Sequence, residues 1–170
     1  MKKLLFGLAL LSCAGTAAAG VRGRAVAVIK DAEGKTVGTA TIAKSEHGIR
    51  VKIKTLALSE GVHGLHIHTV GKCEAPKFTS AGPHWNPDGK QHGRENPNGS
   101  HSGDLPNLVV DAKRRGLLNF DIHQGDLFGD GGLLDGDGAA IVIHAKADDY
   151  KTDPTGGSGD RIACGVFVLR

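Results

Sequence analysis

The sequence lacks three features that would place it in common structural classes. It has no window with convincing helical periodicity, no repeat of about 20 to 50 residues, and no apolar run long enough to cross a bilayer. Aromatic residues make up only 4% of the chain, whereas glycine occurs 26 times. Because glycine supplies the positive φ that tight turns need, this composition favours a turn-rich all-β domain.

The first 19 residues have the pattern of a secretory signal. Lys2 and Lys3 precede the apolar run Leu4–Leu11, and three alanines then provide a small-residue cleavage site before Gly20. The sequence therefore predicts a signal peptide over 1–19 and a mature domain over 20–170. An alternative stays open: Leu-Leu-Ser before Cys13 loosely resembles a bacterial lipoprotein box, in which Cys13 would be acylated and anchor the protein to a membrane.

A strong basic excess is also absent. The formal charge of +3 includes two lysines in the predicted signal and no acid there, so the mature domain carries only +1. Nucleic acid is excluded as a partner on this ground, because its binding usually needs a marked basic surplus. The mature domain keeps Cys73 and Cys164, an even pair in an exported protein, which favours one structural disulfide over two free buried thiols.

Alternating apolar and polar residues predict short antiparallel strands. The clearest case is Ile49, Val51 and Ile53, which alternate with basic residues. Eight such runs are expected, at 24–30, 35–43, 49–56, 65–69, 108–110, 117–122, 139–144 and 164–169. With long loops over 70–107 and 148–160, they predict a flattened eight-stranded antiparallel barrel or sandwich that carries its function on loops.

Histidines concentrate where the strand pattern stops. His66 and His68 are two apart on a predicted strand, so both face one side, and His144 ends a second strand. The long loop holds three more histidines and an acid: His84, His92, His101 and Asp104. Three imidazoles and one carboxylate make a closed zinc set, and a loop of this length inside a compact domain needs such a tie.

Five motifs give the chain a resemblance to the copper-zinc superoxide dismutases of the bacterial exported type. They are GLHIH, AGPHWNP, HSGDLPN, IVIHAKADD and GGSGDRIACG, and they occur in the family's order across the whole mature domain. The chain departs from the family pattern at Leu65 and Trp85, where Phe is common, and at Gly157 and Ser158. The resemblance implies an eight-stranded Greek-key barrel with two long functional loops.

The resemblance also implies the metal ligands. Copper would be held by His66, His68, His84 and His144, and zinc by His84, His92, His101 and Asp104. The shared His84 requires both ring nitrogens to be deprotonated, which two nearby divalent charges make feasible. Four nitrogen ligands suit copper(II), and the closed set with a carboxylate suits zinc.

Three further roles follow from the resemblance. Asp148 matches a carboxylate that accepts hydrogen bonds from a copper ligand and a zinc ligand, here His66 and His92. Arg161 matches an arginine that attracts and orients a small anion beside copper. Cys73 and Cys164 match the family disulfide.

The function implied is the disproportionation of superoxide to oxygen and hydrogen peroxide in the periplasm, with one copper and one zinc per chain. His84 would release copper when copper is reduced, take up a proton and deliver it in the second half-reaction. The alternative is a non-catalytic copper carrier on the same fold, against which Arg161 argues. A cupin-type metalloenzyme also uses two histidines spaced like His66 and His68, but the glycine and glutamate around them do not have the spacing of the cupin motif. Monomer and homodimer stay open.

Overall fold

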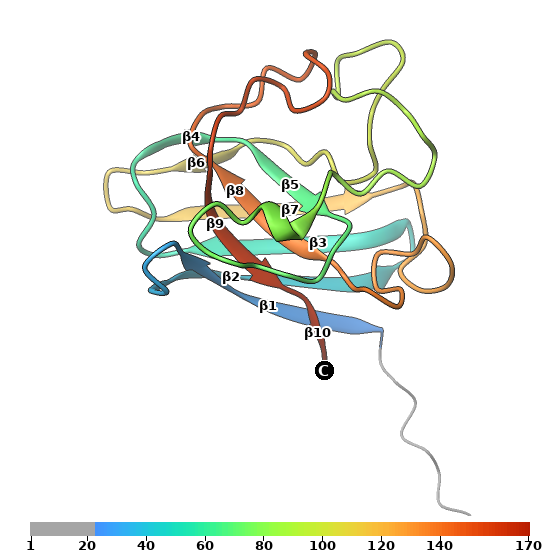
Figure 1. The fold of residues 1–170 in the computed structure, drawn as a ribbon, viewed down its shortest axis with the longest axis horizontal. Helices are drawn as coiled ribbons and strands as arrows, with labels where there is room; N and C mark the ends of the chain where they lie inside the picture. Colours follow the sequence, from blue (N-terminus) through green and yellow to red (C-terminus); the bar gives the residue numbers. More distant parts are fainter. Residues whose placement is uncertain (1–22) are drawn as a thin grey trace, which may run out of the picture.

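A computed structural model describes residues 23–170, and in this part of the chain ten strands form one continuous antiparallel sheet (Figure 1). One short 3-10 helix, η1 (Thr79–Ala81), interrupts the long loop after β5. The strands are β1 (Arg24–Asp31), β2 (Thr36–Ser45), β3 (Gly48–Thr55), β4 (Gly61–His63), β5 (Leu65–His68), β6 (Leu108–Val110), β7 (Gly116–Ile122), β8 (Ala140–His144), β9 (Arg161–Val166) and β10 (Val168–Leu169).

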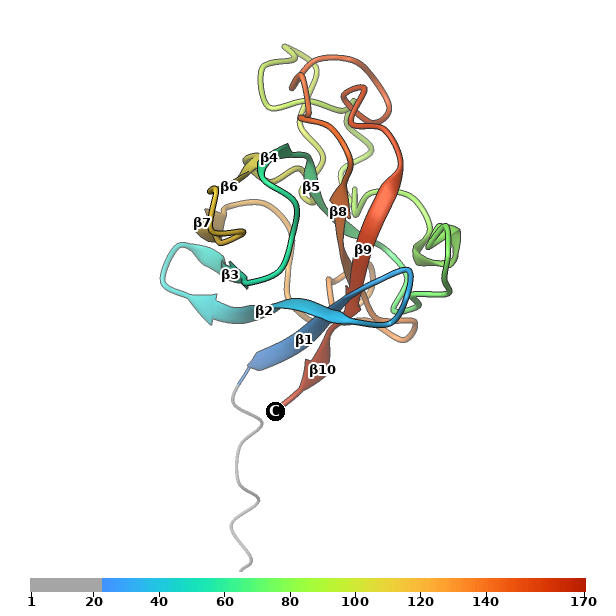
Figure 2. The same ribbon diagram turned by 90° about the vertical axis from the view of Figure 1, so that its left-hand side faces the viewer.

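The sheet curls into a nearly closed, flattened barrel. Its strand order is β4-β6-β7-β3-β2-β1-β9-β8-β5, with β10 paired to β1. The two ends of this order, β4 and β5, are separated in sequence by Gly64 alone, so the chain itself joins the edges of the sheet (Figure 2). The pairing of β7 with β3 and of β9 with β1 shows the crossovers of a Greek key.

Alternation decides which side chains fill the barrel. In β3, Ile49, Val51 and Ile53 are buried, while the basic residues between them are outside. The core is mainly Ile, Leu, Val and Ala; most inward positions of β1 and β2 carry small or branched aliphatic side chains. This packing gives β5 and β8 a rigid support.

The all-β prediction is confirmed, and the strand count differs in two places. β4 was not expected because Gly61–His63 is too short to show alternation. The strand predicted over 164–169 begins earlier, at Arg161, and breaks at Phe167, which turns inward and is 5% exposed. The first difference is a whole short strand, and the second lies at the ends of a strand, where local pattern carries least information.

Two long loops connect the strands, the first from Thr69 to Asn107 and the second from Ala145 to Asp160; the part of the first loop that follows η1 lies beside the second loop at one end of the barrel, while the part around η1 lies near β9 (Figure 1). The predicted disulfide is present: Cys73 and Cys164 are bonded, with Cα atoms 5.6 Å apart, and tie the first loop to β9. Closing a loop of 91 residues stabilises the fold by between about 3 and 4.7 kcal/mol in the chain-entropy model.

Within residues 23–170, no helix has the length and apolar character needed to span a membrane. The predicted signal peptide over 1–19 and the alternative acylation of Cys13 lie outside the described residues. The division into signal and mature domain therefore stays a prediction.

Candidate metal centre

Three histidines of the site stand on paired barrel strands. His66 and His68 come from β5, and His144 ends β8, the strand paired with β5. A fourth, His84, is brought beside them from the first loop, where it bridges to the backbone of His68. One donor nitrogen from each of these four buried rings lies within 4.8 Å of the donors of the other three.

The donor nitrogens of this strand set have no protein partner. His66 Nδ1, His68 Nε2, His84 Nε2 and His144 Nε2 are all buried and make no hydrogen bond. Burying an unpaired polar nitrogen costs free energy, so four such atoms aimed at one point require an occupant. Neutral imidazoles in this number suit a transition metal such as copper(II).

A second donor set converges on one carboxylate oxygen. Asp104 Oδ1 lies 3.0 Å from His84 Nδ1, 3.0 Å from His92 Nδ1 and 3.2 Å from His101 Nδ1. His101 Nδ1 is also 3.3 Å from His84 Nδ1. Three imidazoles and one carboxylate in a tight cluster fit a closed tetrahedral zinc site.

His66 also lies within 4.8 Å of part of this second set, in a group with His84, His92 and Asp104. One His66 nitrogen, Nε2, already contacts Asp148 at 2.7 Å. Its other nitrogen belongs to the strand set, so His66 has no atom left for a second ion. His101 is the better fourth member because its Nδ1 is within 3.3 Å of both His84 Nδ1 and Asp104 Oδ1.

The two sets are joined at two points. His84 offers Nε2 to the strand set and Nδ1 to the loop set, so one ring faces both. Asp148, in the second loop, holds His66 Nε2 at 2.7 Å and His92 Nε2 at 3.0 Å with its two oxygens. Such outer contacts fix which nitrogen of each ring is free to bind a metal.

The strand set stays uncharged at neutral pH. Burial lowers the pKa of His66 to about 3, of His68 to about 2 and of His144 to about 4, and it lowers the pKa of His84 as well. Neutral rings are the form that binds metal. His66, His68 and His144 are therefore ready to accept an ion without first losing protons.

The loop set is more highly charged. Burial opposes charge on His92, but contacts with Asp104 and Asp148 outweigh it and raise the pKa of His92 to about 9. Burial also opposes charge on Asp104 and Asp148, yet hydrogen bonds from histidines hold the pKa of both carboxyls well below the usual range. Two carboxylates thus carry negative charge beside this set, which favours a divalent cation.

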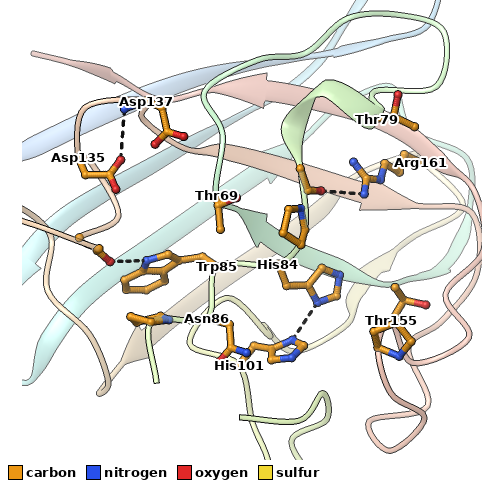
Figure 3. A pocket seen from close by; sticks show the side chains of 16 residues that line it. Thr69, Thr79, His84, Trp85, Asn86, His101, Asp135, Asp137, Thr155 and Arg161 are labelled. Atoms are coloured by element: carbon orange, nitrogen blue, oxygen red, sulfur yellow. Dashed lines mark hydrogen bonds between the residues drawn. The ribbon is translucent and has the colours of Figure 1, made fainter. Parts of the chain in front are cut away.

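Arg161 stands at the mouth of the site, where β9 begins (Figure 3). Its guanidinium donates to the carbonyl of Phe78 at 2.8 Å and to that of Gly82 at 2.9 Å. His84 and Arg161 both line a cavity of about 790 Å³ that is open at the surface. A fixed positive charge beside His84 gives a small anion a place to bind.

The structure adds residues that the sequence did not single out. Asn107 donates from Nδ2 to the carbonyl of Asp148 at 2.9 Å and accepts from the Asp148 N–H at 2.8 Å, so it fixes the backbone of the linking carboxylate. Gly156 has φ +63°, and a Cβ there would collide with the Asp148 carboxylate. Asn107 is the last residue of the HSGDLPN motif, so the motif could have pointed to it. A backbone group such as the Phe78 carbonyl leaves no signal in the sequence.

Fold and site together fit a class of binuclear metalloprotein, a Greek-key barrel whose two donor sets share one histidine. Residues 36–167 match the family model for copper/zinc superoxide dismutase. The chain belongs to the copper/zinc superoxide dismutase family.

Similar proteins come from several bacteria. The chain is 42% identical over 147 residues to "Superoxide dismutase [Cu-Zn]" of Caulobacter vibrioides, covering 84% of each chain, and 41% identical over 176 residues to the protein of that name in Deinococcus radiodurans, covering 96% of this chain and 92% of that one. A crystal structure of a SOD-like protein from Bacillus subtilis superposes with a TM-score of 0.80 at 40% identity, covering 84% of this chain and 97% of that one.

Proposed function

We propose that this protein is a superoxide dismutase whose strand set holds copper and whose loop set holds zinc. The observation that carries the proposal is His84, a buried ring with one nitrogen in each set and no hydrogen-bond partner for Nε2. A ring so placed is expected where two cations are to be bridged. Membership of the copper/zinc superoxide dismutase family supports the same assignment.

Copper, when bound, supplies a one-electron couple between its two oxidation states. One superoxide gives up an electron and leaves as oxygen, and a second takes up that electron and two protons and leaves as hydrogen peroxide. The enzyme's own residues bind the anion, hold the donors in place and manage the protons. Zinc is redox-inactive, so its set acts through charge and through order in the loop.

Arg161 is proposed to bind the incoming anion. Its guanidinium is fixed by two carbonyls and lines the same cavity as His84, so it offers a positive charge in one orientation. His84 is proposed to carry a proton on Nε2, because this nitrogen is free of protein partners and His84 is one of the residues that line the cavity. Transfer from a positioned imidazole would supply one of the two protons that peroxide needs.

The roles of the other ligands rest on the same geometry. His66, His68 and His144 come from rigid paired strands, which suits a site that must survive repeated redox cycling. Asp104 collects three histidines around one oxygen, and Asp148 fixes the free nitrogens of His66 and His92. A copper carrier would need donors but no Arg161 at the cavity, so this residue favours catalysis.

The deciding test measures metal content and activity on one sample. Wild-type protein is expected to hold one copper and one zinc per chain and to disproportionate superoxide. Arg161→Ala should keep both metals and lose much of the rate. Fully metallated wild type without activity would instead support the carrier.

Export to the periplasm through cleavage of residues 1–19 is also part of the proposal. The Cys73–Cys164 disulfide supports it, because structural disulfides persist in oxidising compartments. Mass spectrometry of the purified protein distinguishes a mature chain that starts at Gly20 from one that starts at an acylated Cys13. Light scattering distinguishes a monomer from a homodimer.

A further inference from the structure

The outer face of β2 and β3 carries a positively charged groove that the metal chemistry does not use. Two hollows, of about 660 and 420 Å³, lie along these strands and share Thr41 and Lys52, so they adjoin one another and are treated together as one groove. Its floor is the middle strand, whose outward side chains Thr39, Thr41 and Ala43 are small. The five cations that line this basic groove are Arg24, Lys44, Arg50, Lys52 and Lys54.

The groove has a high local charge for a protein with a formal net charge of only +3. Among the described residues that line it, Glu46 is the sole acid. Arg50 is neutralised by Asp121, with Nη2 and Oδ2 2.8 Å apart. Lys52 and Lys54 are exposed and form no ion pair with any described residue, so their charge is available to a partner.

The cations form a row. Arg50, Lys52 and Lys54 alternate along β3 and all point outward, at intervals of roughly 6.6 Å. Arg24 lies opposite Arg50 across β2, because Arg24 pairs with Ala43 and Ala43 pairs with Arg50. An extended polymer with repeated negative charges could therefore follow the strand direction and meet several cations in turn.

We propose that the basic groove binds a linear acidic polysaccharide. The hydroxyls of Thr39 and Thr41 on the floor can hydrogen-bond sugar hydroxyls between the charges. Single-stranded nucleic acid fits less well, since it stacks bases on aromatic rings and no described lining residue is Phe, Tyr or Trp. A flat bilayer would touch the tips of the lysines but not the recessed floor.

Binding at this groove would leave the metal centre free. β2 and β3 lie across the barrel from β5 and β8, which carry the strand set (Figure 2). The polymer and superoxide would therefore approach opposite sides of the domain. The protein could stay attached to an anionic matrix while it consumes superoxide, and neither process depends on the other.

The test uses the metal-loaded protein and a polyuronate as the probe, at low and at physiological salt. Wild type should bind the polyuronate, and affinity should fall as salt rises because the contacts are charge pairs near the surface. Lys52→Glu/Lys54→Glu should weaken binding at least about tenfold at low salt while dismutase activity is kept. Lys52→Gln/Lys54→Gln should give a smaller loss in the same direction.

The matched control is Lys35→Glu/Lys113→Glu, which changes the net charge equally at two exposed lysines outside the groove. It should bind the polyuronate nearly as well as wild type. Three results would overturn the proposal: no binding by wild type, equal losses in the groove and control variants, or tighter binding of single-stranded DNA or anionic vesicles than of polyuronate at equal charge.

Discussion

The two donor sets of the metal centre are built in opposite ways. The strand set takes His66, His68 and His144 from paired strands of a packed barrel. The loop set takes its unshared members, His92, His101 and Asp104, from a loop between β5 and β6 that contains only a three-residue 3-10 helix. The first set is positioned by the fold, whereas the second can itself position the loop. This difference leads us to expect that an ion in the strand set serves the chemistry and that an ion in the loop set orders the loop.

The largest effect is expected from removing the loop set's central carboxylate. Asp104→Asn should abolish zinc binding, because three histidines converge on the lost negative oxygen. Backbone amides of 84–104 should then exchange with deuterium at least about a hundredfold faster, while those of β5 and β8 stay protected. Hydrogen exchange followed by mass spectrometry measures this.

The control is His68→Ala, which removes a ligand of the strand set. It should lose copper and leave exchange in the loop almost unchanged. Equal loosening of the loop in both variants would contradict the division of roles between the two sets.

A second prediction concerns Asp148, which links the sets. Asp148→Asn keeps the side chain's size but turns one accepting oxygen into a donor, so it can hold either His66 or His92 correctly but not both. Affinity for at least one metal should fall about 10- to 100-fold. Competition with a chelator of known affinity measures each metal; Asp149→Asn, at the exposed neighbouring acid, should have no such effect.

A third prediction concerns Arg161 and the approach of the substrate. Arg161→Ala should lower kcat/KM roughly tenfold and flatten its dependence on ionic strength, because a charge that attracts the anion is gone. Both metals should remain bound. Arg161→Lys should recover part of the rate, since charge returns without the two carbonyl contacts. An unchanged salt dependence in Arg161→Ala would show that other cations guide the anion.

The last prediction is the pH dependence of the metal-free protein, which needs no substitution. In the strand set the folded-state pKa values are below the ordinary 6.5, about 3 for His66, 2 for His68 and 4 for His144. The unfolded chain therefore takes up protons first as pH falls from 6.5 toward 4, and stability should drop by roughly 1 kcal/mol per pH unit for each ring.

His92 in the loop set makes folding stability depend on pH in the opposite direction. Its pKa is raised to about 9, so its contribution is complete below pH 6.5 and is lost as pH rises through about 9. Urea unfolding of metal-free protein should thus show greatest stability near pH 6.5. A free energy of unfolding that keeps rising as pH falls below about 6 would contradict the assignment of the strand histidines as buried and neutral.

Much of this fold was predictable because its strands alternate cleanly, as Ile49, Val51 and Ile53 show. The short β4 was not, because three residues show no period. In the site, the spacing of His66 and His68 predicted a shared face, and the family motifs predicted which loop residues join them. The carbonyls that hold Arg161 depend on backbone positions that no side-chain pattern records, whereas Asn107, which holds the backbone of Asp148, stands at the end of the HSGDLPN motif.

The most direct test of the account is the metal content of wild type and Asp104→Asn, measured together with the copper spectrum and dismutase activity. We expect one copper and one zinc in an active wild type. In the variant we expect copper without zinc, with a copper spectrum changed by the loss of the second cation on His84. Equal zinc in both proteins, or a metallated wild type without activity, would contradict it.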